Sequence, residues 1–442
     1  MNTPIFDFIN NYNSAGTLRT HTPGHKGIPQ YADLAPLYHF DITEISGADS
    51  LFEADGIIAE SEKNMSSLYN TAATVYSATG STLCIQAMLA IMKMEQRRVI
   101  AVRNVHRSFL NTAALLDLDV EWSVPEYTAG LLSGKADLAD LEAHLKHSDA
   151  PACIYLTSPD YTGALADIPA ISALCRRYDA RLIVDNAHGA HLAFMPENLH
   201  PIALGADMCC DSAHKMLPAL TGAAMLHTSR PEYASQLKSA MSLFAGTSPS
   251  YLVMASLDLC SKYISEHIRE DINRNLAELS RFRELFNTKL TFVDGEPFHI
   301  TIKAAESGYN GTEFAQALRE NGVECEYSDS SLVVLLMSPV YRSEDYKRLS
   351  HAVSAAMEKL ERSTPIKDDF SLTLPKRAMS IREAVFSTSE DINVENSEGR
   401  ICGAVRLPCP PAVPIAASGE IIDQNCINIF KRYGIRTVNV VK

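Results

Sequence analysis

The chain has 442 residues, of which 46% are hydrophobic and 21% charged, the balance of a folded globular protein. Its formal net charge of −14 argues against nucleic acid or an anionic membrane as a partner. The charge mildly favours a cationic substrate, although a solvated acidic surface is the simpler explanation. No apolar run reaches the roughly 18 residues of a membrane span, and the start lacks the pattern of a signal peptide. We therefore expect a cytoplasmic protein whose ten cysteines are mostly reduced.

The first part of the chain is rich in turn residues. The segment from His21 to Gly27 contains two glycines and a proline, so residues 1–65 are interpreted as an extended arm. From about Thr74 short apolar runs alternate with amphipathic segments such as residues 168–178. The apolar runs are residues 99–102, 153–156 and 182–184. This alternation predicts an α/β fold, a mostly parallel sheet with helices on both faces.

The second half of the chain predicts smaller α+β structure. A long helical stretch over residues 251–286 links the sheet domain to strand-like segments at 289–293, 298–302 and 332–336. A helix is expected over residues 380–386, followed by a proline-rich, extended connection at 407–414. We expect four parts: an arm, a large domain, a linker helix with a small domain, and a C-terminal domain. Their ranges are 1–65, 66–260, 261–365 and 366–442.

A Thr-Gly-Ser-Thr turn joins an expected strand to an expected helix near residue 80. Free N–H groups and hydroxyls at a helix N-terminus suit a phosphate, which makes Gly80, Ser81 and Thr82 candidates for an anion site. The alternative is that Ser81 or Thr82 is a simple helix cap.

His106 follows the expected strand at residues 99–102. Ligands of open α/β sheets bind at the carboxyl edge, so this imidazole could stack on a planar cofactor ring. A surface or structural histidine is the alternative.

Asp185 ends a strand that looks buried, where an unpaired carboxylate is costly. Metal binding with His188 and His191 is the rival explanation, but we find no further ligand nearby at a convincing spacing and expect no metal. A protonated ring nitrogen would pair with Asp185 without a metal. His188 could support that pair or have a structural role.

Lys215 stands before the apolar run that begins at Met216, where a charged ammonium is costly to bury. Burial depresses the pKa of a lysine and makes its amine nucleophilic toward an aldehyde. Ser212 and His214 are close enough in sequence to reach the same ligand. A Schiff-base lysine and a carboxylate for the pyridinium nitrogen are what pyridoxal phosphate needs from a protein.

With these elements in this order, the chain resembles the Orn/Lys/Arg decarboxylases, pyridoxal phosphate enzymes of the aspartate-aminotransferase fold. The resemblance spans nearly the whole length. The matching segments are residues 21–27, 41–44, 47–51, 80–82, 185–191, 212–220, 247–251 and 410–420. Because the chain begins almost at the first of these, it resembles the shorter form, which lacks an N-terminal receiver-like domain.

The resemblance implies a role for each candidate residue. Lys215 would form the Schiff base, Asp185 would pair with the ring nitrogen and His106 would stack on the ring. Ser81, Thr82, Ser212 and His214 would hold or flank the phosphate, with Gly80 and His188 beside them. Lys215 or His214 could protonate the product carbon. In this family the active site lies between two subunits, so Thr247 and Ser248 would reach the partner's cofactor in a homodimer or larger homo-oligomer.

Some positions depart from the family pattern. Asn186 replaces the usual Glu, Cys409 and Ala412 replace Tyr and Gly, and Ala404 stands where the shorter members often have Glu. The C-terminal changes put the substrate in doubt rather than the cofactor. The resemblance implies decarboxylation of L-arginine to agmatine and CO2, as in polyamine metabolism, with lysine and then ornithine as the next candidates. Another activity of the same fold, an aminotransferase or lyase, and a catalytically silent regulatory homologue are the alternatives.

Overall fold

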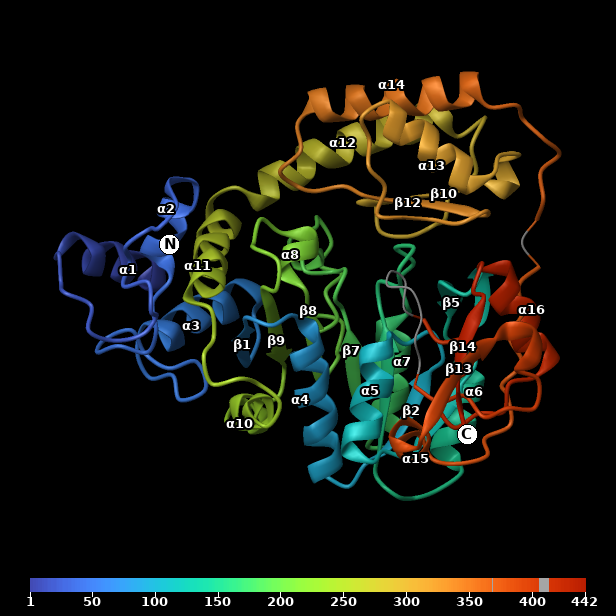
Figure 1. Ribbon diagram of the computed structural model, residues 1–442, viewed down its shortest axis with the longest axis horizontal. Helices are drawn as coiled ribbons and strands as arrows, with labels where there is room; N and C mark the ends of the chain where they lie inside the picture. Colours follow the sequence, from blue (N-terminus) through green and yellow to red (C-terminus); the bar gives the residue numbers. More distant parts are fainter. Residues whose placement is uncertain (368, 405–412) are drawn as a thin grey trace. The chain divides into compact units, whose positions relative to one another are not determined.

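The computed structural model describes residues 1–367, 369–404 and 413–442 (Figure 1). The chain forms two compact units, each built from two stretches of sequence. The first unit comprises Met1–Ile91 with Leu182–Asn273, and the second comprises Met92–Arg181 with Arg274–Lys442. Among the described residues, no helix is both long enough and apolar enough to cross a bilayer. The four-part division by residue range stays a prediction.

A seven-stranded sheet has the order β1-β9-β8-β7-β6-β2-β3. In sequence order its strands are β1 (Ala73–Ser77), β2 (Arg98–Val102), β3 (Val120–Ser123), β6 (Ala152–Thr157), β7 (Arg181–Asp185), β8 (Met208–Asp211) and β9 (Ala224–Thr228). The pairs β2–β3, β2–β6 and β7–β8 are parallel, whereas β9 runs antiparallel to β8 and β1. The expected α/β fold with a mostly parallel sheet is confirmed.

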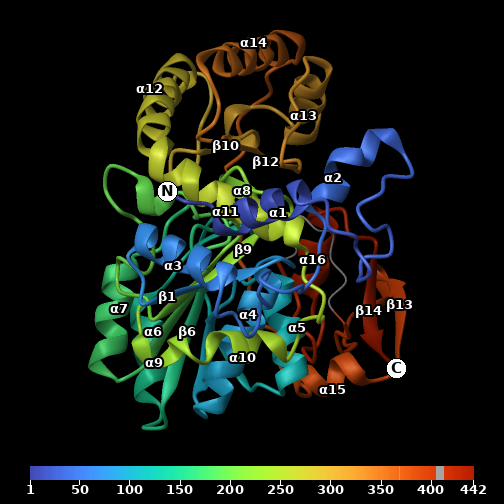
Figure 2. The same cartoon turned by 90° about the vertical axis from the view of Figure 1, so that its left-hand side faces the viewer.

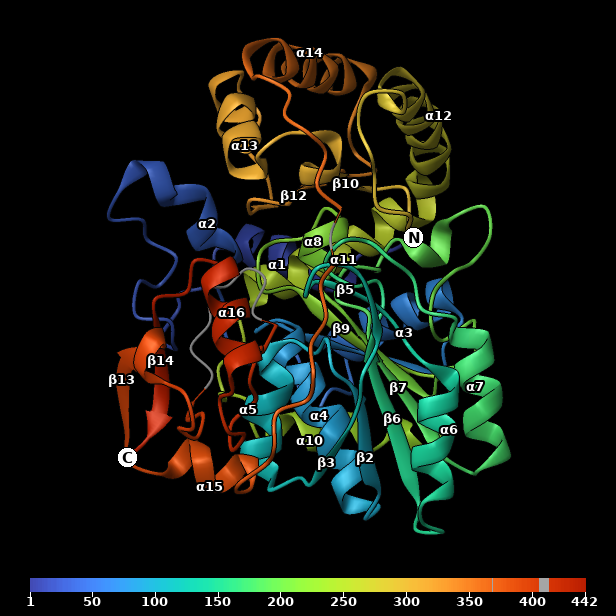
Figure 3. The same cartoon turned by 90° about the vertical axis from the view of Figure 1, so that its right-hand side faces the viewer.

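Helices of the second unit lie against its strands on both sides. Figure 3 shows α5 (Arg107–Leu116) on one side of β2 and β6, and α6 (Leu138–Lys146) with α7 (Ile168–Arg177) on the other. Helix α7 starts where the side chain of Asp167 accepts a hydrogen bond from the Ala170 N–H, and it has two arginines in its last turn. An acceptor at the start and cations at the end both stabilise a helix. The short hairpin β4 (Glu126–Ala129) and β5 (Ser133–Lys135) precedes α6.

The first unit contains the N-terminal region and most of the helices before α12 (Ile268–Phe286) that lie outside residues 92–181. These elements are α1 (Pro4–Ser14), η1 (Ala32–Leu34), α2 (Ala35–Phe40), α3 (Ile57–Tyr69), α4 (Ser81–Met94, which runs into the second unit), η2 (Leu192–Phe194), α8 (Ala213–Met216), α9 (Pro231–Ala234), α10 (Leu237–Ser242) and α11 (Tyr251–Glu266). The expectation of an extended arm is wrong for α1, where Ile5 and Ile9 are fully buried one turn apart. Figure 2 shows α1 beside α11.

Asp258 of α11 ties down the start of α1. Its Oδ2 accepts hydrogen bonds from the backbone N–H groups of Ile5 and Phe6 at 2.9 and 3.0 Å, and its Oδ1 accepts one from Ser61 Oγ at 2.6 Å. The first N–H groups of a helix have no partner within the helix, so this carboxylate satisfies two of them.

The small α+β region of the second unit differs in two places from the sequence-based expectation. The single helical stretch is two helices, α11 and α12 (Ile268–Phe286), because the backbone departs from helical angles at His267. The expected strand at residues 289–293 is only an isolated bridge between Phe292 and Ile302. The remaining elements are β10 (His299–Lys303), η3 (Ala305–Ser307), α13 (Gly311–Glu320), β11 (Tyr327–Ser328), β12 (Leu332–Leu336) and α14 (Ser343–Lys359), and the three strands form one antiparallel sheet.

The C-terminal region consists of α15 (Ile381–Phe386), β13 (Ser389–Asn393), η4 (Val394–Asn396), α16 (Gln424–Arg432) and β14 (Thr437–Val441). The expected helix over residues 380–386 is confirmed as α15, which Ser380 and Glu383 cap. A fully buried arginine, Arg103, donates from its two Nη atoms to Glu420 at 2.9 and 2.6 Å and stacks over the ring of Trp122. This pair joins the end of β2 to the C-terminal region. Most of the proline-rich segment, with Cys409 and Ala412, lies outside the described residues.

Candidate cofactor site

Two neighbouring parallel strands bring the main candidates to one edge of the sheet. Asp185 is the last residue of β7, and it pairs in register with Cys210 of β8. After β8 ends at Asp211, Ser212 leads into the short helix α8, which contains His214 and Lys215. The carboxyl ends of both strands therefore carry the carboxylate and the amine that the sequence singled out.

The Lys215 amine has a specific neighbour. Its Nζ lies 2.9 Å from Nε2 of His188, and the lysine side chain is half-buried whereas His188 is buried. An imidazole nitrogen at this distance can take up a proton from the amine, which is the change that makes a lysine nucleophilic. His188 thus lies beside the lysine, and its role toward the cofactor stays a prediction.

Asp185 is buried, with 2% of its surface exposed. Its Oδ1 accepts hydrogen bonds from the Ala187 N–H at 3.2 Å and from Cys210 Sγ at 3.5 Å. A buried carboxylate needs a cationic or hydrogen-bonding partner. A protonated ring nitrogen is a group of the right charge for this position.

Two hydroxyl groups meet at the start of α4. Ser212 Oγ donates to Ser81 Oγ at 2.8 Å, and Gly80, just before the helix, has a φ of +83° that favours glycine. No other atom lies within 4 Å of the place where a side chain at Gly80 would begin. Thr82 is exposed in the first turn of the helix. Open space, paired hydroxyls and a helix N-terminus fit a phosphate group.

His214 is held by its backbone contact rather than by a charged group. Its Nδ1 lies 2.9 Å from the Ala223 carbonyl oxygen, which requires the proton on Nδ1 and leaves Nε2 for other contacts. Burial lowers the pKa of His214, so the imidazole is neutral near pH 7.

The other candidates are placed less directly. His106 belongs to the second unit, where it is the N-cap of α5 and its Nδ1 accepts from the Ser108 N–H at 3.2 Å. Its stacking on the ring stays a prediction. Thr247 and Ser248 are exposed in the segment before α11, so both are available to a partner subunit. Their contact with a partner's cofactor also stays a prediction.

Asn186, which replaces the Glu usual in the family, has a hydrogen-bond partner in the structure. Asn186 Nδ2 donates to Asp211 Oδ1 at 2.6 Å, so this amide lies beside a carboxylate of the next strand. Sequence reasoning missed Asp211 and the two buried histidines at its other oxygen, His200 and His227. Burial alone raises the pKa of Asp211, but the two imidazoles hold it below its ordinary value. In the sequence, the alternation of Cys209 and Asp211 along one buried strand could have indicated this cluster.

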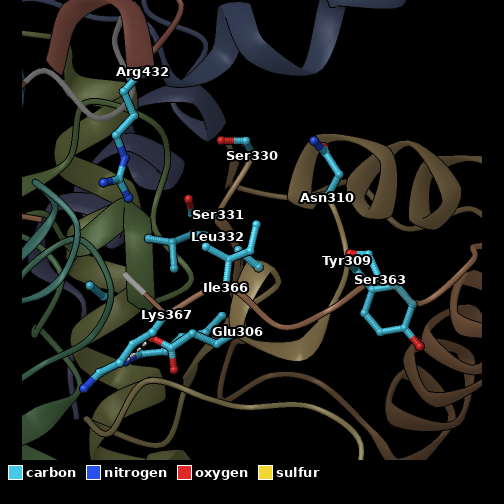
Figure 4. Close-up of a pocket in the computed structure, with 13 residues that line it drawn as sticks. Glu306, Tyr309, Asn310, Ser330, Ser331, Leu332, Ser363, Ile366, Lys367 and Arg432 are labelled. Carbon is cyan, nitrogen blue, oxygen red and sulfur yellow. Dashed lines mark hydrogen bonds and ion pairs between the residues drawn. The ribbon is translucent and has the colours of Figure 1, made fainter. Parts of the chain in front are cut away.

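A cavity of about 380 Å³ lies in the second unit (Figure 4). Its charged lining groups are Lys303, Lys367, Arg432 and Glu306. None of the candidate cofactor residues lines it, so it is distinct from the site at the end of β7 and β8.

Comparison with known proteins shows the family and the fold of the chain. The profile of the family described as Orn/Lys/Arg decarboxylase, major domain, matches residues 3–304. Arginine decarboxylase of Bacillus anthracis is 26% identical over 97% of this chain and 92% of its own length. The uncharacterized protein YaaO of Bacillus subtilis (strain 168) is 25% identical over 98% of this chain and 94% of its own. Lysine decarboxylase A from Pseudomonas aeruginosa has the same fold, with a TM-score of 0.82, 18% identity and coverage of 99% and 80% of the two chains.

Proposed function

Since this chain belongs to the Orn/Lys/Arg decarboxylase family of pyridoxal phosphate enzymes, we propose that it removes CO2 from a basic amino acid. L-Arginine, giving agmatine, is the first candidate, with lysine and then ornithine behind it. The observation that carries the proposal is the contact of Lys215 Nζ with His188 Nε2, together with the buried Asp185 at the end of β7. An inactive homologue has no need of this arrangement.

The residues present fit the cofactor. Lys215 would attach its aldehyde, Asp185 would hold a proton on the ring nitrogen, and Ser81 with Ser212 would bind the phosphate at the start of α4. When bound, pyridoxal phosphate supplies the electron sink for the electrons left as CO2 departs.

Residues of the chain supply the proton transfers and the orientation. His188 Nε2 is placed to take the proton that Lys215 Nζ loses, and Lys215 can return a proton to the product carbon. His214, whose ring proton is on Nδ1, could do so from Nε2 only after Nε2 has itself taken up a proton. By holding the phosphate and the ring nitrogen, Ser81, Ser212 and Asp185 would orient the substrate, which decides the bond that breaks.

The preference for arginine is supported by relatives named arginine decarboxylase, from Bacillus anthracis and Bacillus subtilis among others.

The acidic residues of the N-terminal region give the preference for arginine less support. Asp49 accepts hydrogen bonds from the N–H groups of Ser50, Asp55, Gly56, Ile58 and Ala59, so it shapes a turn. Asp41 pairs with His25 at 3.0 Å. The exposed Glu44, Glu53 and Asp55 remain as candidate partners of a substrate cation.

The enzyme is proposed to be a cytoplasmic homodimer with a shared active site. Free, buried thiols such as Cys84, Cys153 and Cys260 agree with a reducing compartment. The N-terminal region exposes apolar side chains that a second copy could cover. They are Leu18, Ile28, Tyr31, Leu34 and Leu37, exposed by 84, 62, 71, 46 and 48%.

The test is to assay CO2, amine and keto-acid formation from arginine, lysine and ornithine with purified enzyme and added pyridoxal phosphate. We expect equimolar CO2 and amine from at least one of the three. Lys215→Ala should abolish this and the adduct trapped by borohydride, whereas the control Lys63→Ala, at an exposed lysine of α3, should change neither. Keto acid as the main product, or turnover confined to neutral or acidic amino acids, would refute the proposal.

A further inference from the structure

A second cluster of functional groups lies beside the cofactor site, within the first unit. Cys209 and Asp211 alternate along β8 and share one face of the sheet, and His227 of β9 stands opposite Cys209. His200 comes from the loop before β8. All four residues are at most 1% exposed.

Three of the four residues have side-chain atoms with the mutual spacing of metal ligands, and the fourth, His227, is close to Asp211. Asp211 Oδ2 lies 3.1 Å from His200 Nε2 and 3.3 Å from His227 Nε2, and His200 Nε2 lies 3.7 Å from Cys209 Sγ. The ligand atoms of His200, Cys209 and Asp211 all lie within 4.8 Å of one another. A tetrahedral zinc ion with ordinary bond lengths places its ligand atoms roughly 3.3–3.7 Å apart.

The orientation of His227 is a separate observation that points to an ion. Its Nε2 is fully buried and makes no hydrogen bond, although Asp211 Oδ2 is only 3.3 Å away. At this distance the lack of a hydrogen bond means that the ring nitrogen and the carboxylate oxygen are poorly aligned, which leaves Nε2 available to an ion.

Outer contacts hold the ligands in place. Thr74 Oγ1 lies 2.8 Å from His227 Nδ1, and Asn186 Nδ2 donates to the other oxygen of Asp211. The ring of Tyr69 packs against both histidines, with centroids 5.1 and 4.6 Å away. Metal ligands in proteins usually have such partners, which fix the imidazole tautomer and the free carboxylate oxygen.

We propose that His200, Cys209 and Asp211 bind a divalent transition-metal ion in a closed structural site, with His227, next to the Asp211 carboxylate, as the fourth ligand once its ring turns toward the ion. A thiolate with two imidazoles and a carboxylate suits zinc best. Binding releases the thiol proton of Cys209 to solvent, and no ligand position is left for substrate because the cluster is buried. Since β8 leads directly into the helix with Lys215, the ion would fix the strand that positions the reactive amine.

The experiment is metal analysis of the untagged holoenzyme, produced in cells supplied with zinc and purified without chelators. We expect about one zinc per chain by inductively coupled plasma mass spectrometry. Cys209→Ser and His200→Gln should each reduce this severalfold, and Cys153→Ser, at a buried thiol of the second unit, should not. Protein loaded with Co2+ should show the visible bands of tetrahedral cobalt, with a thiolate band that Cys209→Ser removes.

The metal content of the wild-type protein alone can overturn the proposal, so the test does not depend on a variant that folds. Folded holoenzyme without bound metal would overturn the proposal and leave a hydrogen-bonded His-Asp-His cluster. Metal retained at full content in both ligand variants would overturn it as well. Neither outcome bears on the proposed decarboxylation, because metal content is measured without turnover.

Discussion

The contacts of His188 in the structure suggest a more specific role than its position in the sequence does. In the sequence the residue is a histidine after a strand-end aspartate; in the structure its Nε2 lies 2.9 Å from the Lys215 amine. The contact depends on the turn between Asp185 and Gly189, where Gly189 N–H donates to the Asn186 carbonyl at 2.8 Å. That turn brings the imidazole back toward helix α8.

We predict that His188→Ala lowers kcat by roughly 10²-fold, the usual contribution of a positioned acid or base. The acidic limb of the pH profile of kcat/KM should also move, because the group that takes the lysine proton is gone. His188→Gln, which keeps an acceptor, should restore part of the rate. His147→Ala, at an exposed histidine, is the control and should match wild type. An unchanged pH profile would assign His188 a purely structural role.

At this scale the sequence predicted the groups but not all their contacts. Asp185, Ser212 and Lys215 could be found because strand ends and the residues after them share one sheet edge. Asp211 with His200 and His227 could not, because their meeting depends on β9 pairing antiparallel to β8 and on the path of a loop. Such contacts are set by tertiary structure, on which local patterns carry no information.

Among the elements, the attachment of α1 to α11 depends on a carboxylate with an unusual pKa. Burial raises the pKa of Asp258 from 3.8 to about 6, although Ser61 and two backbone N–H groups favour its charged form. Between these two values the folded protein binds more protons than the unfolded chain, so its stability falls as pH rises.

We predict that the free energy of unfolding of wild type, relative to Asp258→Asn, decreases by roughly 2–3 kcal/mol as pH rises from about 4 to 6. Urea unfolding at several pH values measures this. Asp149→Asn, at an exposed loop, should run parallel to wild type. A difference that grows in the opposite direction would mean that Asp258 is ionised with a depressed pKa.

The Arg103–Glu420 pair connects another two elements, the end of β2 and the C-terminal region. Glu420→Gln would leave a fully buried guanidinium without its counter-charge. Removing one partner of a buried pair costs about 3–5 kcal/mol, and we expect that loss in the free energy of unfolding. Glu390→Gln, at the exposed Arg400 pair, should cost less than about 1 kcal/mol. Equal effects of the two substitutions would contradict the structural role of Arg103.

Element boundaries were predicted where local signals are strong. Ser380 with Glu383 marks the start of α15 as a capping box does, and β12 matches its apolar run. The break at His267 was missed because neither glycine nor proline marks it. Tyr263 of α11 hydrogen-bonds Asp271 of α12 across the break, a contact visible only in three dimensions.

Over the whole molecule, the sheet and family could be predicted because the motifs are numerous and ordered. The two compact units could not, because each combines stretches separated by some ninety residues of sequence. Apolar periodicity shows what is buried and says nothing about which distant segment buries it.

A shared active site predicts complementation between inactive variants. Lys215→Ala and Ser248→Arg should each be inactive alone, and subunits mixed by mild unfolding and refolding should recover roughly a quarter of wild-type activity. That fraction follows because half of the dimers are mixed and each mixed dimer has one intact site. Light scattering should show at least a dimer. Mixtures that stay inactive while mixed dimers form would place Ser248 outside the partner's site.

The stacking of Arg103 on Trp122 has an optical consequence. Trp122 is the only tryptophan of the chain, and its ring centroid lies 4.6 Å from the guanidinium carbon that Glu420 helps to hold. The ultraviolet emission of the protein therefore originates mainly from one indole, next to the point where the C-terminal region is fastened. Its wavelength and polarisation give a built-in signal of whether that region is attached, without any label.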